Sequence, residues 1–155
     1  MISMISINNQ GIQSDASSGR SRINATGRLI VFQSASQVWG QPGNYYKVFL
    51  YDSETAPLEL ISVSSEGVVG NKYSGDSDIS DDGRYIVFNS EADNLVADDS
   101  NESIDVFLHD RKTGTTERIG LEVWYPRISG DGRYVVFQAA SPIQAVDPLP
   151  FPASP

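Results

Sequence analysis

The chain has 155 residues, of which 39% are hydrophobic and 20% are charged, a composition typical of a globular domain and unlike that of a disordered chain. Its 20 acidic and 11 basic residues give a net charge of -9, which argues against nucleic acid and anionic lipid as partners. The absence of cysteine excludes disulfides, thiol catalysis and thiolate metal sites. No apolar run approaches the roughly 20 residues of a membrane helix, so we expect no membrane insertion.

The beginning of the chain predicts a β-strand rather than a signal peptide. Residues 1–10 alternate apolar with polar side chains and carry no basic segment. Residues 4–11 (MISINNQG) align without a gap on residues 60–67 (LISVSSEG), which lie 56 positions later. This similarity at a distance indicates an internal repeat.

A second pattern occurs three times along the chain. In each copy a glycine stands before an arginine, where a tight turn needs a residue with positive φ. The apolar run after each arginine predicts a strand that is buried on both faces. The copies are residues 21–32 (SRINATGRLIVF), 77–88 (SDISDDGRYIVF) and 126–137 (PRISGDGRYVVF).

Two further strands follow the first two copies of this pattern. Residues 47–52 (KVFLYD) match residues 105–110 (DVFLHD), and each segment ends at a turn. Another extended stretch follows each turn, at residues 58–63 and 115–119. The repeating unit therefore has four strands, which we call a, b, c and d, and no helical periodicity.

The pattern Ile-Ser-x-Asp-Gly-Arg-Tyr-Ile-Val-Phe, followed by Asp-Val-Phe-Leu-x-Asp and a Thr-Gly turn, resembles the TolB-type WD40-like (PD40) β-propeller repeat. The resemblance covers residues from about 4 to 140. It implies an all-β fold of four-stranded antiparallel blades, and a periplasmic or extracellular location. It does not specify a function, because propellers of this kind bind, scaffold and accompany enzymes.

The strand content is d, abcd, abcd, ab, which predicts a partial β-propeller. We expect an outer strand at residues 1–10, blade one at 20–64, blade two at 76–120, a partial blade three at 126–141 and a proline-rich tail at 142–155.

Closed propellers hold about four to eight blades, so we expect this chain to be completed by head-to-tail strand exchange with other copies of itself. Strand d of one copy would complete the ab blade of the next, giving either a six-bladed ring of two copies or an open filament. The expected interface residues are Met4, Ile5, Ile7, Val135 and Phe137.

The loop of residues 98–105 (DDSNESID) is the candidate metal site. Oxygen-bearing side chains alternate along it, as in calcium loops. Ile104 replaces the glycine of an EF-hand loop, and Asp110 lies about 16 Å along the strand from Asp105. The PD40 resemblance implies a calcium site of a different kind, and the alternative is an acidic, solvated loop with Asx turns. The proposed calcium ligands are Asp99, Asn101, Ser103 and Asp105.

Other polar candidates have structural interpretations. His109 is the single histidine and is equivalent to Tyr51, so we expect an amphipathic residue on a strand surface rather than a catalytic base. A group of four aspartates is typical of turns: Asp76, Asp78, Asp81 and Asp82.

Five aromatic residues do not follow the repeat, and we expect them to serve packing or an interface, with glycan binding as the alternative. They are Trp39, Tyr45, Tyr46, Trp124 and Tyr125.

These observations favour a non-enzymatic, structural module that assembles with itself, with calcium as its only expected cofactor. No phosphate-binding loop or nucleophile elbow occurs, so we assign no catalytic residue. One alternative is a ligand-binding propeller that recognises a glycan or a protein. A further alternative is a propeller fragment of a larger enzyme, such as a serine peptidase.

Overall fold

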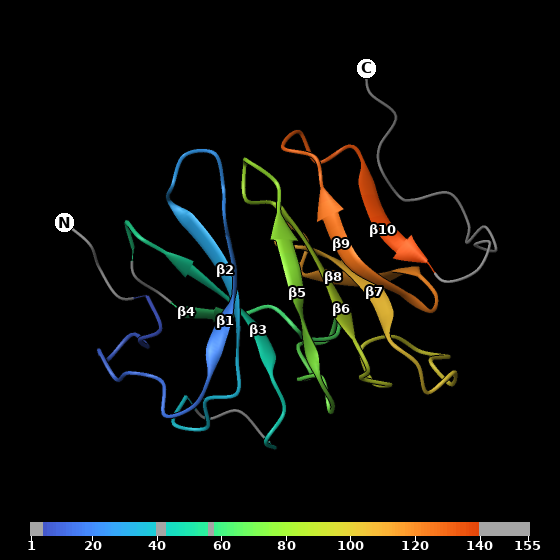
Figure 1. Cartoon of the computed structure of the whole chain (residues 1–155), viewed down its shortest axis with the longest axis horizontal. Coiled ribbons are helices and arrows are strands. Elements are labelled where there is room, and N and C mark those ends of the chain that lie inside the picture. Colours follow the sequence, from blue (N-terminus) through green and yellow to red (C-terminus); the bar gives the residue numbers. More distant parts are fainter. Residues whose placement is uncertain (1–4, 40–42, 56–57, 140–155) are drawn as a thin grey trace.

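The computed structural model describes residues 5–39, 43–55 and 58–139. These residues form three antiparallel sheets of four, four and two strands, arranged side by side (Figure 1). The described residues contain no helix, and so none that is long and apolar enough to cross a membrane. The predicted all-β partial propeller of four-stranded antiparallel blades is confirmed.

Each four-stranded sheet is one blade with its strands in chain order. Blade one contains β1 (Ser18–Ile23), β2 (Leu29–Ser34), β3 (Lys47–Asp52) and β4 (Leu58–Leu60). Blade two contains β5 (Ser74–Ile79), β6 (Tyr85–Ser90), β7 (Asp105–Asp110) and β8 (Thr115–Gly120). The third sheet contains β9 (Val123–Ile128) and β10 (Val135–Ala139).

Two apolar layers hold the sheets together. The first lies between blades one and two and contains Val31 and Phe88, and the second lies between blade two and the third sheet and contains Val87 and Val123. Successive residues of a strand point to opposite faces, so Val87 and Phe88 of β6 serve different layers. The prediction that strand b is buried on both faces is confirmed for β2, which is buried along its whole length.

The first strand of each sheet (β1, β5 and β9) contains a β-bulge that the sequence pattern does not predict. Arg20, Asp76 and Tyr125 occupy equivalent positions in β1, β5 and β9, and all three have positive φ angles, of 50°, 47° and 54°. The register of all three strand pairs shifts at these points. A bulge re-aims the side chains around it, and here the strand continues beyond it. These strands therefore begin two or three residues earlier than predicted.

A repeated ion pair fixes the end of strand c to the turn before strand b. Arg28 donates to Asp52 from Nε and Nη2, at 2.9 and 2.7 Å. Arg84 donates to Asp110 in the same way, at 3.0 and 2.7 Å. These two-pronged contacts give the Gly-Arg motif a structural role in each complete blade.

The N-terminal segment reproduces the end of blade one. Ile7 forms an isolated β-bridge with Gln13, and Val63 forms the equivalent bridge with Val69. The described part of residues 1–10 is thus a short turn with one bridge. Its expected role as an outer strand for another copy stays a prediction.

Candidate functional site

The sheets at the two ends of the row expose surfaces whose equivalents are buried inside it. We call the side of blade one that points away from blade two the front face, which includes Ile23 and Gly27. We call the side of the third sheet that points away from blade two the rear face, which includes Tyr134 and Val136. The two faces lie at opposite ends of the molecule (Figure 1).

Exposure at one repeat position defines the front face. Ile79 is 5% exposed and Ile128 is 8% exposed, because the preceding sheet covers each of them. The equivalent residue of blade one is Ile23, which is 60% exposed. Ile23 therefore occupies a position that is buried between sheets in the other two copies of the repeat, but no described sheet covers it.

The rear face shows the complementary difference. Val31 and Val87 are fully buried, because the following sheet covers each of them. Their equivalent in β10 is Val136, which is 65% exposed. In the described part of the chain β10 pairs with β9 alone, so its other edge is unpaired. An unpaired edge next to exposed apolar side chains is a ready surface for association.

A residue-to-glycine contact also recurs between sheets. A methyl group added at Gly83 would lie 2.0 Å from Leu29 Cδ1, and one added at Gly132 would lie 2.8 Å from the ring of Tyr85. The first residue of strand b thus covers the turn glycine of the following sheet. At the two ends of the row no described residue makes this contact. Tyr134 is 63% exposed, and a methyl group at Gly27 would meet only Ile23, at 3.9 Å.

The chain's own N-terminal segment already covers the part of the front face near β4. The Leu58 amide donates to Asn9 Oδ1, as the equivalent Thr116 amide donates to Ser65 Oγ at 3.0 Å. Trp39 Nε1 donates to the Ile12 carbonyl at 3.2 Å. Residues 5–13 therefore lie on blade one as residues 61–69 lie on blade two.

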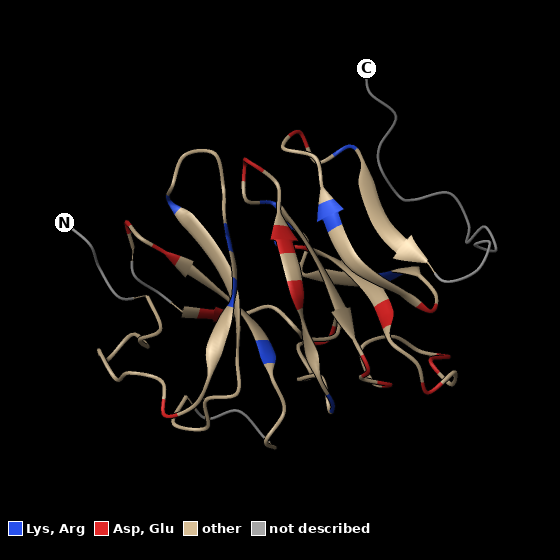
Figure 2. Ribbon diagram, in the orientation of Figure 1, with Lys and Arg blue, Asp and Glu red and all other residues tan. Residues whose placement is uncertain are grey.

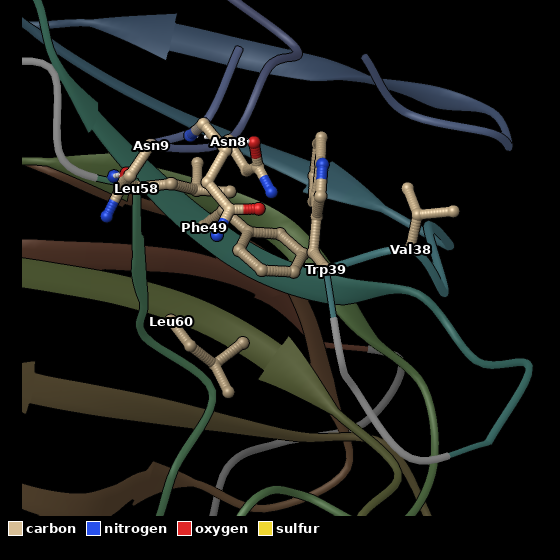
Figure 3. Close-up of a pocket in the computed structure, with 8 residues that line it drawn as sticks. Asn8, Asn9, Val38, Trp39, Phe49, Leu58 and Leu60 are labelled. Carbon is tan, nitrogen blue, oxygen red and sulfur yellow. Dashed lines mark hydrogen bonds between the residues drawn. The ribbon is translucent and has the colours of Figure 1, made fainter. Parts of the chain in front are cut away.

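A cavity of about 440 Å³ lies between this segment and blade one. The Trp39 ring meets Phe49 edge to face, with ring centres 5.1 Å apart, and Asn8 and Asn9 lie on the opposing segment (Figure 3). The lining residues are Asn8, Asn9, Gln10, Val38, Trp39, Phe49, Leu58 and Leu60. Trp39 is equivalent to Leu95, which is buried between blades one and two. The cavity therefore marks the place that a preceding blade would fill.

Polar contacts between the sheets join side chains of opposite charge. Arg20 and Asp76, the bulge residues of β1 and β5, form an ion pair, and hydrogen bonding to Asp76 raises the pKa of Arg20. Arg111 Nη2 lies 2.8 Å from Glu59 Oε2. β5 contains two acidic residues, Asp76 and Asp78, whereas β9 contains one basic residue, Arg127 (Figure 2). Both ion pairs join blade one to blade two.

In the predicted calcium loop, Arg118 provides a positive charge between two carboxylates. Its Nη1 lies 2.9 Å from Asp99 Oδ1 and 3.1 Å from Asp105 Oδ2. Asp105 also accepts from Asn101 Nδ2, at 3.0 and 3.1 Å, and from the Glu122 amide. Burial, followed by the charge of Asp105, raises the pKa of Asp99.

This loop brings Asp99, Asn101 and Asp105 together, whereas Ser103 donates to the Asn101 carbonyl at 3.3 Å. Among the described residues no cluster of three or more acidic, histidine or cysteine side chains has metal-binding geometry. A calcium ion at these residues would compete with Arg118 for Asp99 and Asp105. Calcium binding stays a prediction.

His109 lies inside the structure, so its predicted place on a strand surface is wrong. It is 5% exposed, and its Nδ1 is hydrogen-bonded to Thr116 Oγ1 at 2.9 Å. Thr116 Oγ1 in turn donates to the Val63 carbonyl of blade one. Burial between the blades lowers the pKa of His109.

The structure separates the predicted interface residues into three groups. Val135 and Phe137 are partly buried against blade two, so they lie on the opposite side of β10 from the rear face. Ile5 and Ile7 lie in the segment that covers the front face and are partly exposed. Met4 lies outside the described residues. Strand alternation applied to the third copy of the repeat would have identified Val136, which the sequence analysis missed.

The non-repeated aromatic residues have different surroundings. Tyr46 meets Tyr73 edge to face, and Tyr45 lies 5.4 Å from Lys47 Nζ. Trp124 and Tyr125 lie within β9, whereas the expected partial blade three begins only at residue 126.

Comparison with known proteins supports the fold. No family model matches the sequence, and no curated protein matches it. The structure of TolB from Acinetobacter baumannii is similar, with a TM-score of 0.53 and 13% identity over 82% of this chain and 27% of that chain. A putative TolB from Agrobacterium tumefaciens is similar over 76% of this chain and 36% of that chain, with a TM-score of 0.52 and 16% identity. The chain therefore spans about a third or less of these TolB structures and has the fold of part of a TolB β-propeller.

Proposed function

We propose that this chain is a non-catalytic propeller segment that joins copies of itself head to tail. In this assembly the rear face of one copy packs on the front face of the next. The observation that carries the proposal is the pair of exposures at Ile23 and Val136, whose repeat equivalents are buried in both internal joints. The two faces are the two halves of a joint that the chain already builds twice.

The energetics favour such a contact. Covering a Val or Ile side chain is worth about 1.5–3 kcal/mol, and the joint covers such a side chain on each face. Because the joint connects two different surfaces, each copy that is added leaves one free face, and copies continue to add until the last one meets the first. A six-bladed ring of two copies lies within the range of about four to eight blades seen in closed propellers. An open filament follows if the rotation does not close.

The buried state of His109 supports a role other than catalysis. Its Nδ1 is engaged by Thr116, and within the described residues no serine is hydrogen-bonded to the imidazole. A Ser-His pair of the kind used by serine peptidases would need that contact.

Light scattering and negative-stain microscopy of purified protein test the proposal. We expect particles larger than one chain, either rings or filaments, whose mass rises with concentration. The variant Val136→Asp should be a monomer, because it buries a charge in the joint. Val68→Asp is the matched control, since Val68 is 53% exposed but belongs to neither end face. A wild-type protein that is monomeric at all concentrations would contradict the proposal.

A calcium ion at Asp99, Asn101, Ser103 and Asp105 is a separate proposal. It would stiffen the loop of blade two and has no contact with either end face. Assembly that survives a chelator, while the melting temperature falls, would support calcium as a stabiliser of the blade.

Glycan binding in the cavity beside Trp39 is a second candidate function. The observation that favours it is the combination of an aromatic ring with three amide side chains along one cavity. A soluble sugar that binds there should change the fluorescence of the wild type and not of Trp39→Phe. Trp124→Phe is the control, because the chain has only two tryptophans. Unchanged fluorescence over a panel of sugars would count against this candidate.

A further inference from the structure

We infer that the joint between copies keeps the register of the two internal joints, so that Tyr134 of one copy covers Gly27 of the next and Val136 covers Ile23. This inference rests on the proposed function and adds the partner surface, residue by residue. The occupant of the front face is thus a second copy of this chain, presented through β9 and β10.

The glycine contact fixes the position of the two copies along the strand. In the internal joints Leu29 and Tyr85 lie over Gly83 and Gly132, at the same step of the repeat. Tyr134 is the next residue in that series, and Gly27 is the equivalent turn glycine of blade one, which no described residue of another sheet covers. A glycine is needed here twice over, for its positive φ of 75° and for the approach of the ring.

In the joint between copies, one blade is built from strands of both copies. Residues 5–13 remain on their own blade one, held by the Leu58–Asn9 hydrogen bond. In the assembly they take the strand d position in the blade that β9 and β10 of the other copy begin, one strand position beyond the neighbour of β10, since strand d pairs with strand c in the complete blades. The Thr116–Ser65 hydrogen bond shows this geometry inside the chain, where the end of blade one lies on blade two.

At one repeat position the joint between copies would bring two like charges together. Arg22, Asp78 and Arg127 are equivalent residues of β1, β5 and β9, so charges alternate along the internal joints. In the joint between copies Arg127 would face Arg22 of the next copy. Two like charges at this point weaken association at low salt.

Thiol cross-linking tests the register directly, because the chain has no cysteine. An Ile23→Cys copy is mixed with a Val136→Cys copy and treated with a short bis-maleimide. A second pair, Thr26→Cys with Tyr134→Cys, guards against a substitution that itself weakens the joint. The control pair is Ile23→Cys with Val68→Cys, and sedimentation velocity records association of every mixture.

We expect both test pairs to give a cross-linked dimer and the control pair to give little. Association without cross-linking of either test pair above the control would overturn the register and leave the proposed function standing. Absence of association in wild-type protein would overturn the proposed function, and the register with it.

Discussion

Arg84 donates two hydrogen bonds to Asp110, from Nε at 3.0 Å and from Nη2 at 2.7 Å, and so ties the turn before β6 to the end of β7. The same contact joins Arg28 to Asp52 in blade one. Hydrogen bonding to Arg84 lowers the pKa of Asp110, so this contact is strongest when the carboxyl group is ionised.

Arg84→Lys should lower the melting temperature, because lysine keeps the charge but cannot make the two-pronged contact. Arg133→Lys is the matched control, since Arg133 occupies the equivalent position of the third sheet and has no ion pair with a described residue. Thermal unfolding followed by circular dichroism gives the comparison. Equal effects of the two substitutions would show that the pairing with Asp110 contributes little.

Gly132→Ala should destabilise the protein by about 3 kcal/mol, because it combines positive φ with a clash against Tyr85. Gly27→Ala has the same backbone strain without the clash and should cost about 1–2 kcal/mol. Urea unfolding in the Val136→Asp background measures both without a contribution from association. In the associating protein Gly27→Ala should also weaken the joint. Equal losses of stability would argue against the Tyr85 contact.

Arg118→Gln should cost about 3 kcal/mol, because it leaves the buried carboxylates of Asp99 and Asp105 without the partly exposed positive charge that pairs with them. Calcium should then raise the melting temperature of the variant more than that of the wild type, since the ion and the guanidinium compete. Magnesium at the same ionic strength is the control. A larger calcium shift in the wild type would instead show that Arg118 and the ion bind together.

Lys47 should make stability rise between about pH 8 and pH 10. Burial lowers its pKa to about 8 from 10.5, so in this range the unfolded chain binds more protons than the folded one. The expected slope is at most about 1.4 kcal/mol per pH unit. Lys47→Met should flatten it. Above about pH 10 Tyr73 acts in the opposite direction, because burial raises its pKa to about 12. An unchanged slope in Lys47→Met would remove Lys47 as the cause.

Association should strengthen as sodium chloride is added. The chain carries a net charge of -9, and the joint brings Arg127 towards Arg22 of the next copy, so salt screens two sources of repulsion. Sedimentation velocity at several salt concentrations measures the effect. Arg127→Gln should reduce the salt dependence. Dissociation on addition of salt would instead point to a joint held by opposite charges.

The repeat made the blades predictable, because the Gly-Arg turn and the apolar run after it have direct structural consequences. The bulges at Arg20, Asp76 and Tyr125 were not predictable in the same way. Positive φ is usually signalled by glycine, and here three larger residues adopt it. The alignment of the repeats places these residues together but does not reveal their conformation.

The end faces were predictable in outline but not in detail. The strand count indicated that blades would be exposed. Val135 and Phe137 were predicted as interface residues because they are apolar, without regard to the side of the strand to which they point. Alternation along β10 puts those two towards blade two and Val136 away from it. Burial of His109 was missed for a related reason, because the end of blade one covers it and that contact joins residues distant in sequence.

The central claim is that two different faces of the chain join head to tail, and mixing two blocked variants tests it most directly. Val136→Asp blocks the rear face and Ile23→Asp blocks the front face, so each variant alone should have the mass of one chain. Mixed in equal amounts, they should form a dimer with one copy of each, which sedimentation equilibrium can weigh. A mixture that remains monomeric, while the wild type associates, would contradict the claim that the rear face of one copy binds the front face of another.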